Sequence, residues 1–250
     1  MTLSTPSEPL VVFFPPAGGT ASSCGPFSRS AEDVLDVSVI NYELPGRGRR
    51  MHEPLLHSID DVVDDFAWYI EHFADAGPRR LIYVGHSFGC YVAWAVQSAA
   101  LRRAQLSSLE AELLVLACNT PLHLRENLLG ETEFDKDSLQ SSRHEWALSY
   151  LVRLNAIPAP ILRDRRMLNI VVDAFLADIT VADGLSFSCT ELQISSPIIS
   201  ISARDDQATS EHERWREMTT GRTDHVVVSG GHFPAYDDLV PLWRQISHRL

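Results

Sequence analysis

The sequence predicts an α/β fold in which a mostly parallel central sheet carries helices on both faces. Short, mostly apolar runs recur at residues 10–14, 37–42, 81–84, 113–118, 198–201 and 226–228. Stretches with helical spacing of apolar residues lie between several of them, as at residues 58–73 and 91–100. Continuous apolar runs are typical of strands buried on both faces, and their alternation with helices is typical of parallel sheets.

Length and composition fit one sizeable core. The chain has 250 residues, of which 45% are hydrophobic, so one domain, or a domain with a small inserted cap, can bury a full core. The net charge of −12 argues against nucleic acid as a partner. The sequence shows no heptads and no evident interface stretch, so we expect a monomer.

The sequence gives no sign of a membrane span or an export signal. No apolar run approaches the roughly 18–20 residues that a span requires, and the first residues lack the pattern of a signal peptide. Four cysteines, Cys24, Cys90, Cys118 and Cys189, show no metal-ligand spacing. We therefore expect a cytoplasmic protein with free thiols, no metal and no cofactor.

The first elements have clear boundaries. The strand at residues 10–14 ends at two prolines and leads into a loop, residues 17–19, whose two glycines leave backbone N–H groups exposed. Pro45 and Gly46 stop the second strand, at residues 37–42. Residues 58–73 are predicted to form a helix with Ser58 as its N-cap, because apolar residues recur at helical spacing behind an acidic first turn.

The chemistry is expected at one pentapeptide, Gly85-His86-Ser87-Phe88-Gly89. An apolar strand leads into it and a helix rich in small residues leads out, which is the context in which G-x-S-x-G marks a nucleophile elbow. The sharp turn holds Ser87 in a strained backbone conformation, and a side chain at either glycine would collide with a neighbouring element. The hydroxyl then stands at a helix N-terminus, where developing negative charge is favoured.

A nucleophilic serine needs a general base that a carboxylate orients. His232 follows the last predicted strand, and Asp205 and Asp206 follow the strand before it, so all lie at the carboxyl edge of the sheet, where α/β folds bind ligands. The order Ser, Asp, His is that of hydrolases with this strand order. We choose His232 as base and Asp206 as acid, because the acid usually stands three residues after a small residue that ends the strand. Spacing alone does not exclude Asp205.

The neighbours of Ser87 are assigned other roles. His86 should point away from Ser87 in a tight turn, so we interpret it as structural, and the remaining histidines lack a catalytic context. Cys90 falls within the following helix and is interpreted as packing. The oxyanion formed in acyl transfer needs two backbone N–H donors. We expect these from Phe88, directly after the nucleophile, and from Ala17 in the loop after the first strand.

One interval breaks the alternation of strands and helices. Residues 119–196 contain no convincing strand, and helices are predicted at residues 145–154 and 165–177. So long a connection indicates a lid or a small subdomain. Its apolar faces could pack on the core or roof a cavity for an acyl group, and we favour the roof. The expected division is a core of residues 1–118 and 197–250 with a helical lid of residues 119–196.

These motifs resemble those of the type II thioesterases that accompany nonribosomal peptide and polyketide synthases, close kin of the stand-alone fatty-acid-synthase thioesterase. The resemblance covers nearly the whole chain from Leu10 and rests on five segments, at residues 14–19, 42–50, 85–89, 205–206 and 230–233. The Leu-Pro-Gly-Arg-Gly stretch at residues 44–48 separates this family from general esterases better than the pentapeptide does. Two departures, Ala203 for the usual glycine and Gln207 for a frequent proline, concern turn geometry only.

The resemblance implies an α/β-hydrolase fold with a helical lid and a serine hydrolase that cleaves acyl thioesters. The substrate it implies is an acyl group on the phosphopantetheine arm of an acyl or peptidyl carrier protein, and the role is editing, in which misprimed or stalled groups are cleared during antibiotic biosynthesis. No cofactor is implied, since the pantetheine belongs to the carrier. Arg47, Arg49 and Arg50 cluster after the second strand and are candidates for contact with that carrier.

Three alternatives remain at this point: a general carboxylesterase or lipase, an acyltransferase that uses an alcohol or amine in place of water, and a binding module that has lost catalysis. The presence of Ser87, Asp206 and His232 in order argues against the binding module. The two other enzymes would use the same residues, so only a comparison of substrates separates them from a thioesterase.

Overall fold

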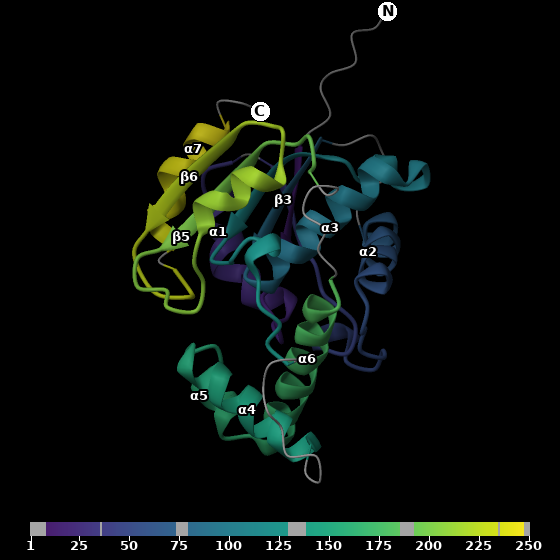
Figure 1. Cartoon of the computed structure of the whole chain (residues 1–250), viewed down its shortest axis with the longest axis vertical. Coiled ribbons are helices and arrows are strands. Elements are labelled where there is room, and N and C mark those ends of the chain that lie inside the picture. The colour runs from purple at the N-terminus through teal and green to yellow at the C-terminus, as the bar shows by residue number, and fades with distance from the viewer. Residues whose placement is uncertain are drawn as a thin grey trace, which may run out of the picture.

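The computed structural model describes residues 9–35, 37–73, 80–129, 139–185, 193–234 and 236–247, and these contain one six-stranded sheet (Figure 1). Its strands lie in the order β2-β1-β3-β4-β5-β6, and every neighbouring pair is parallel. The predicted parallel α/β sheet is confirmed. The strand bounds are Pro9–Phe14 (β1), Ser38–Asn41 (β2), Arg80–His86 (β3), Ala111–Ala117 (β4), Ile198–Ala203 (β5) and Thr223–Val228 (β6).

Two helices pack on each face of the sheet. One face carries α2 (Ile59–Phe73) and α3 (Phe88–Arg102), and the other carries α1 (Gly25–Glu32) and α7 (Val240–Ser247). The predicted cap of α2 is present, because the Ser58 hydroxyl accepts a hydrogen bond from the N–H of Asp61 at 3.1 Å. Both faces of the sheet are therefore covered, which is why its inner strands are apolar along their length.

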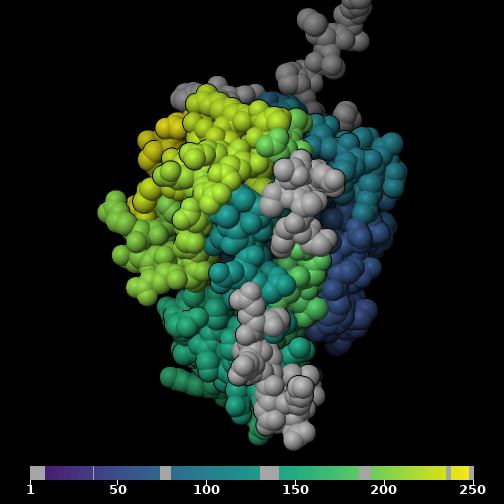
Figure 2. Space-filling model, in the orientation of Figure 1, coloured from purple at the N-terminus to yellow at the C-terminus, as the bar shows by residue number. Residues whose placement is uncertain are grey.

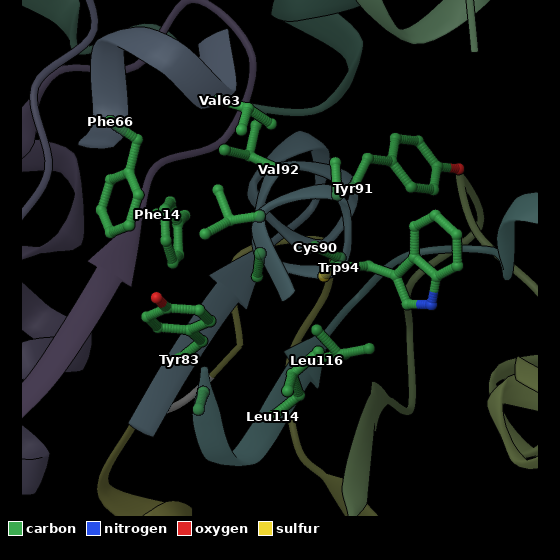
Figure 3. Packing of buried hydrophobic residues seen from close by; sticks show 14 of the residues in the cluster. Phe14, Val63, Phe66, Tyr83, Cys90, Tyr91, Val92, Trp94, Leu114 and Leu116 are labelled. Carbon is green, nitrogen blue, oxygen red and sulfur yellow. The ribbon is translucent and has the colours of Figure 1, made fainter. Parts of the chain in front are cut away.

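The side chains of β1 alternate between the two faces, as the period of a strand requires. Val11 and Phe13 join the cluster under α1 and α7, whereas Leu10, Val12 and Phe14 join the cluster under α2 and α3. Figure 3 shows the second cluster, where the Phe14 ring lies among other aromatic rings. Its centroid is 4.9 Å from that of Phe66 on α2 and 5.3 Å from that of Tyr83 on β3. These ring contacts fix α2 against the sheet.

The element boundaries differ from the sequence expectation where polar residues are buried or paired. Strand β6 begins at Thr223, before the apolar run, because His225 hydrogen-bonds the hydroxyls of Ser200 and Ser202 on β5 at 2.8 and 3.0 Å. Helix α1, not predicted, has only 8 residues, begins with Gly25-Pro26 and buries two serines, so it offers too few apolar residues for a clear sequence signal. Helix α7 was not predicted either.

In the part of the interval between β4 and β5 that the structure describes, the α-helices are α4 (Leu139–Arg153), α5 (Ala159–Leu162) and α6 (Arg165–Asp183). They lie beyond the carboxyl edge of the sheet, and their teal and green surface forms one end of the molecule (Figures 1 and 2). Their apolar residues form a cluster of their own, which includes Leu151, Val172 and Phe175. In the described part of the interval only an isolated bridge, between Ile194 and Thr219, has strand character.

The arginine cluster at residues 47–50 is not the exposed surface that the sequence suggested. Arg47 and Arg50 are only 2% and 8% exposed, and each is held in an ion pair, with Asp178 and with Asp65 and Glu53 respectively. Of the three candidates for contact with a carrier protein, only Arg49 is therefore exposed in the structure.

The cysteines within the described residues, Cys24, Cys90 and Cys118, are buried free thiols, as expected, and Cys189 lies outside those residues. Among the helices of the described chain, none combines the length and the apolar character needed to cross a membrane.

Candidate active site

Ser87 occupies the sharp turn between β3 and α3. Its backbone has φ 54° and ψ −122°, a region that L-residues rarely adopt. The turn is tight on both sides: a Cβ atom at Gly85 would lie 2.5 Å from the nitrogen of Cys90, and one at Gly89 would lie 2.1 Å from the carbonyl oxygen of Phe14. Both positions therefore require glycine, because the nearby atoms belong to the backbone and cannot move aside cheaply.

His232 links the serine to a carboxylate. Its Nε2 lies 3.0 Å from the Oγ of Ser87, and its Nδ1 lies 3.1 Å from an Oδ of Asp206. Because an ionised carboxylate only accepts hydrogen bonds, Nδ1 carries the proton and Nε2 is left as the acceptor for the serine hydroxyl. The imidazole is thus in the tautomer that can remove a proton from Ser87.

The structure brings Asp206, not Asp205, to the histidine. The Asp206 side chain is fully buried and also accepts hydrogen bonds from the Thr209 hydroxyl at 2.6 Å and from the Ala208 N–H at 2.9 Å. Burial alone would raise the pKa of this carboxyl, but the hydrogen bonds from His232 and Thr209 outweigh it and lower the pKa below its ordinary value. Asp206 is therefore ionised at neutral pH. Asp205 is exposed.

Three polar neighbours hold this arrangement: His86, which the sequence analysis interpreted as structural, and Asn119 and Thr209, which it did not single out. His86 donates from Nε2 to the backbone carbonyl of His232 at 2.8 Å, and Asn119 donates to the carbonyl of Ser87 at 2.6 Å. Thr209 lies between Asp206 and the Nε2 of His212, at 2.8 Å from the latter. Burial, followed by the charge of His232, lowers the pKa of His86 to about 3, so its ring is neutral. The contacts of His86 and Asn119 join distant parts of the chain, so no local pattern could have indicated them.

Cys90 is packing, as its position in the helix indicated. Its Sγ lies 3.3 Å from the carbonyl oxygens of Gly85 and Ala117. Burial raises the pKa of the thiol well above its ordinary value, so the reactive thiolate does not form at neutral pH.

The two expected oxyanion donors lie beside Ser87. Phe88 is the first residue of α3, so its N–H has no acceptor within the helix. Ala17 lies in the turn after β1, and within the part of the chain that the structure describes its N–H donates to no protein acceptor. Ala17, Ser87 and Phe88 line the same cavity.

That cavity measures about 290 Å³ and lies between the sheet edge and the helices of the interval. Its wall is largely apolar on the side of α4 and α6, with Tyr150, Leu151, Phe175 and Ile179, and more polar on the opposite side, with Asn119, Thr120 and Thr209 among others. A carbonyl compound with an apolar chain can thus reach Ser87 with its chain between the helices.

Comparison with known proteins agrees with this geometry. The thioesterase domain family model matches residues 9–250. The chain is 22% identical over 236 residues to the human medium-chain S-acyl fatty acid synthase thioesterase, covering 92% of this chain and 83% of that protein. It is 26% identical over 242 residues to thioesterase PikA5 of Streptomyces venezuelae, covering 96% and 80%.

A solved structure shares the fold. YbtT, described as a type II thioesterase from the yersiniabactin NRPS/PKS biosynthetic pathway, matches with a TM-score of 0.71 at 20% identity, covering 97% of this chain and 91% of that one.

Proposed function

The chain belongs to the thioesterase domain family, and we propose that it is an editing enzyme that hydrolyses acyl thioesters on the phosphopantetheine arm of carrier proteins. The names of YbtT and of several relatives tie those proteins to biosynthetic pathways, which supports a place in nonribosomal peptide or polyketide biosynthesis. The observation that carries the proposal is the hydrogen-bonded series Asp206, His232, Ser87 at the floor of a partly apolar cavity. The free thiols of the protein fit a reducing compartment, and we propose that it acts in the cytoplasm.

The proposed reaction begins when Nε2 of His232 takes the hydroxyl proton of Ser87 and the Oγ attacks the thioester carbonyl carbon. The N–H groups of Ala17 and Phe88 would stabilise the resulting oxyanion, a contribution worth about 10²–10³ in rate for each donor. The C–S bond then breaks, and the protonated His232 returns its proton to the leaving pantetheine thiol. Asp206 holds the imidazole in the required tautomer and stabilises its charged form.

The second half of the reaction releases the acid. The acyl group is now an ester on Ser87, and His232 takes a proton from a water molecule that attacks its carbonyl carbon. Collapse of this second intermediate returns the proton to Ser87 and frees the carboxylic acid. At about 290 Å³ the cavity is at the small end of the range for ligand-binding pockets, about 300–1,000 Å³, so a short acyl chain is the substrate to test first.

The test is the rate of acid release from a short-chain acyl carrier protein. We expect rapid release by the wild type, slower turnover of the matching free acyl-pantetheine thioester, and a loss of about 10⁶ in kcat for Ser87→Ala. Ser210→Ala is the matched control. Ser210 also lines the cavity, but it hydrogen-bonds to Thr120 through its backbone N–H and not through its hydroxyl. Equal turnover of the matching oxygen ester would point to a general esterase. Acyl transfer to an added amine or alcohol would point to a transferase. Activity that survives in Ser87→Ala would exclude the proposed mechanism.

A further inference from the structure

The segment that carries the Leu-Pro-Gly-Arg-Gly stretch reaches the loop of residues 17–19. Arg47 donates from its two terminal nitrogens to both carboxylate oxygens of Asp178 on α6, at 2.5 and 2.8 Å. Neither side chain is more than 3% exposed. The same guanidinium lies 3.4 Å from the carbonyl oxygen of Gly19. Arg47 therefore contacts the loop and α6 at once, from a segment that the proposed reaction does not use.

Asp178, the partner of Arg47, also contacts the loop of residues 17–19 directly. One of its carboxylate oxygens accepts a hydrogen bond from the N–H of Gly18 at 2.8 Å, in addition to the bonds from Arg47. The residue directly before Gly18 is Ala17, whose N–H is the proposed oxyanion donor. The N–H of Gly18 belongs to the next peptide unit, so a shift of Gly18 toward or away from α6 would act on the donor through the Cα of Ala17. The N–H of Gly19 also donates to the carbonyl oxygen of Pro16 at 2.9 Å, which ties the loop to the Pro16–Ala17 peptide unit that bears the donor.

An acidic residue of the segment that carries Arg47 holds the chain just after the loop. The buried Glu43 accepts hydrogen bonds from the N–H of Ala21 at 2.9 Å and from the N–H of Arg49 at 3.0 Å. Gly48, which has φ +52°, leaves the space for this carboxylate, since a Cβ atom there would lie 2.2 Å from it. Side chains from residues 43–47 thus contact Gly19 and, just beyond the loop, Ala21, while Asp178 of α6 holds Gly18.

The loop also packs closely on α6. A Cβ atom at Gly18 would lie 3.0 Å from the Cβ of Phe175 and 3.1 Å from the carbonyl oxygen of Val171. Phe175 lines the cavity. The position of the loop and the position of this cavity wall are therefore set by the same contacts.

We propose that Arg47 and Asp178 are positioning residues that hold the Ala17 N–H in place for the oxyanion. This inference rests on the proposed function. A buried ion pair is weak evidence for stability by itself, because apolar replacements are often as stable, and the geometry here gives the pair another use. Bidentate pairing fixes direction as well as distance, and a displacement of about 1 Å at a catalytic group can lower a rate about 10²-fold.

The test compares Arg47→Lys with Arg50→Lys. Arg50 makes a bidentate pair with Asp65, at 2.8 and 2.6 Å, and is similarly buried, but its partners are Asp65, Glu53 and the carbonyl of Glu43 and do not include the 17–19 loop. Lysine keeps the positive charge in both variants and loses the bidentate geometry. We expect Arg47→Lys to lower kcat for a short acyl-pantetheine thioester by about 10- to 100-fold, with KM changed less than about threefold. Arg50→Lys should keep kcat within about threefold. Its melting temperature should fall by about as much as that of Arg47→Lys.

A direct readout of the donor accompanies the kinetics. An alkyl boronic acid forms a tetrahedral anionic adduct with a nucleophilic serine, so its binding reports the oxyanion site without turnover. The affinity should fall by about the same factor as kcat in Arg47→Lys and remain unchanged in Arg50→Lys.

Equal kcat and equal boronate affinity in the two variants would overturn the inference. If Arg47→Lys does not fold, Asp178→Asn, which keeps the shape of the acceptor, is measured in its place with the same expectation and the same refuting result. A wild type that hydrolyses no thioester but binds the boronate would refute the proposed function and leave this test intact.

Discussion

His86 offers a quantitative test of the buried environment beneath the proposed active site. The ring is 3% exposed and donates to the carbonyl of His232, and burial is the largest cause of its lowered pKa, about 3. Replacement by glutamine keeps a side-chain N–H donor and removes the titrating group. The comparison of wild type with His86→Gln therefore isolates the proton that the folded state does not bind.

The sign and size follow from this pKa. In the unfolded chain a histidine binds its proton below about pH 6.5, whereas the folded His86 stays neutral down to about pH 3. Between these values the unfolded state binds more protons, so the free energy of unfolding falls as the pH falls, by about 1.4 kcal/mol per pH unit. From about pH 7.5 to about pH 5 the contribution of His86 amounts to about 2 kcal/mol.

The assay is urea denaturation of both proteins at these two pH values. We expect the wild type to lose about 2 kcal/mol more than His86→Gln on acidification. Burial also lowers the pKa values of His212 and His225, but these residues are present in both proteins, so their effect cancels in the difference. A difference below about 0.5 kcal/mol would show that His86 titrates normally in the folded protein and would refute the reasoning from burial.

Two further predictions concern Asp206 and the glycine that follows the nucleophile turn. Asp206→Asn should lower kcat for thioester hydrolysis about 10⁴-fold, because the amide no longer selects the tautomer of His232. In Asp205→Asn, the control, kcat should stay within about threefold of the wild type. Similar rates for the two variants would contradict the assignment of Asp206. Gly89→Ala should lower the free energy of unfolding by about 3 kcal/mol or more in thermal or urea denaturation, since its Cβ would lie 2.1 Å from the Phe14 carbonyl oxygen. Gly231→Ala, whose nearest contact is at 3.9 Å, is the control, and equal stability of the two would show that the turn relaxes.

The elements that the sequence indicated well are those with local signals. The strands at residues 10–14, 81–84 and 113–118 are apolar along their length because helices cover both sides, and that property can be read without knowing which helices do so. The proximity of Ser87, Asp206 and His232 follows from the same rule, since each comes directly after a parallel strand and such strands end at one edge. Their catalytic roles remain a prediction for the assays above.

The features that the sequence did not indicate depend on partners far away in the chain. Helix α6 was expected to end at residue 177, yet it runs on to Asp183. Within the added turn, Asp178 is buried because it pairs with Arg47, 131 residues away. In the same way, His86 contacts His232 across 146 residues. Charge patterns alone favoured an exposed surface for Arg47, because an unpaired buried charge is costly and its partner was not visible locally.

The contacts of α6 also bear on how the cavity could open. At Asp178 this helix is tied to the 17–19 loop, and at its end Asp183 accepts hydrogen bonds from the N–H groups of Leu128 and Leu129 at 3.2 and 2.7 Å. Asp178 also forms the buried ion pair with Arg47, and removing one partner of such a pair costs about 3–5 kcal/mol. By contrast, α4 and α5 make their main helix contacts with α6, through apolar side chains around Leu151 and Ile157.

A movement that widens the cavity at the lowest cost therefore displaces α4 and α5 over α6 and leaves the 17–19 loop undisturbed. If the interval of residues 119–196 acts as a lid, the boundary between its moving and fixed parts lies between α5 and α6 and not at the ends of the interval. In that case the cavity would open without moving the loop that bears the proposed oxyanion donor, Ala17.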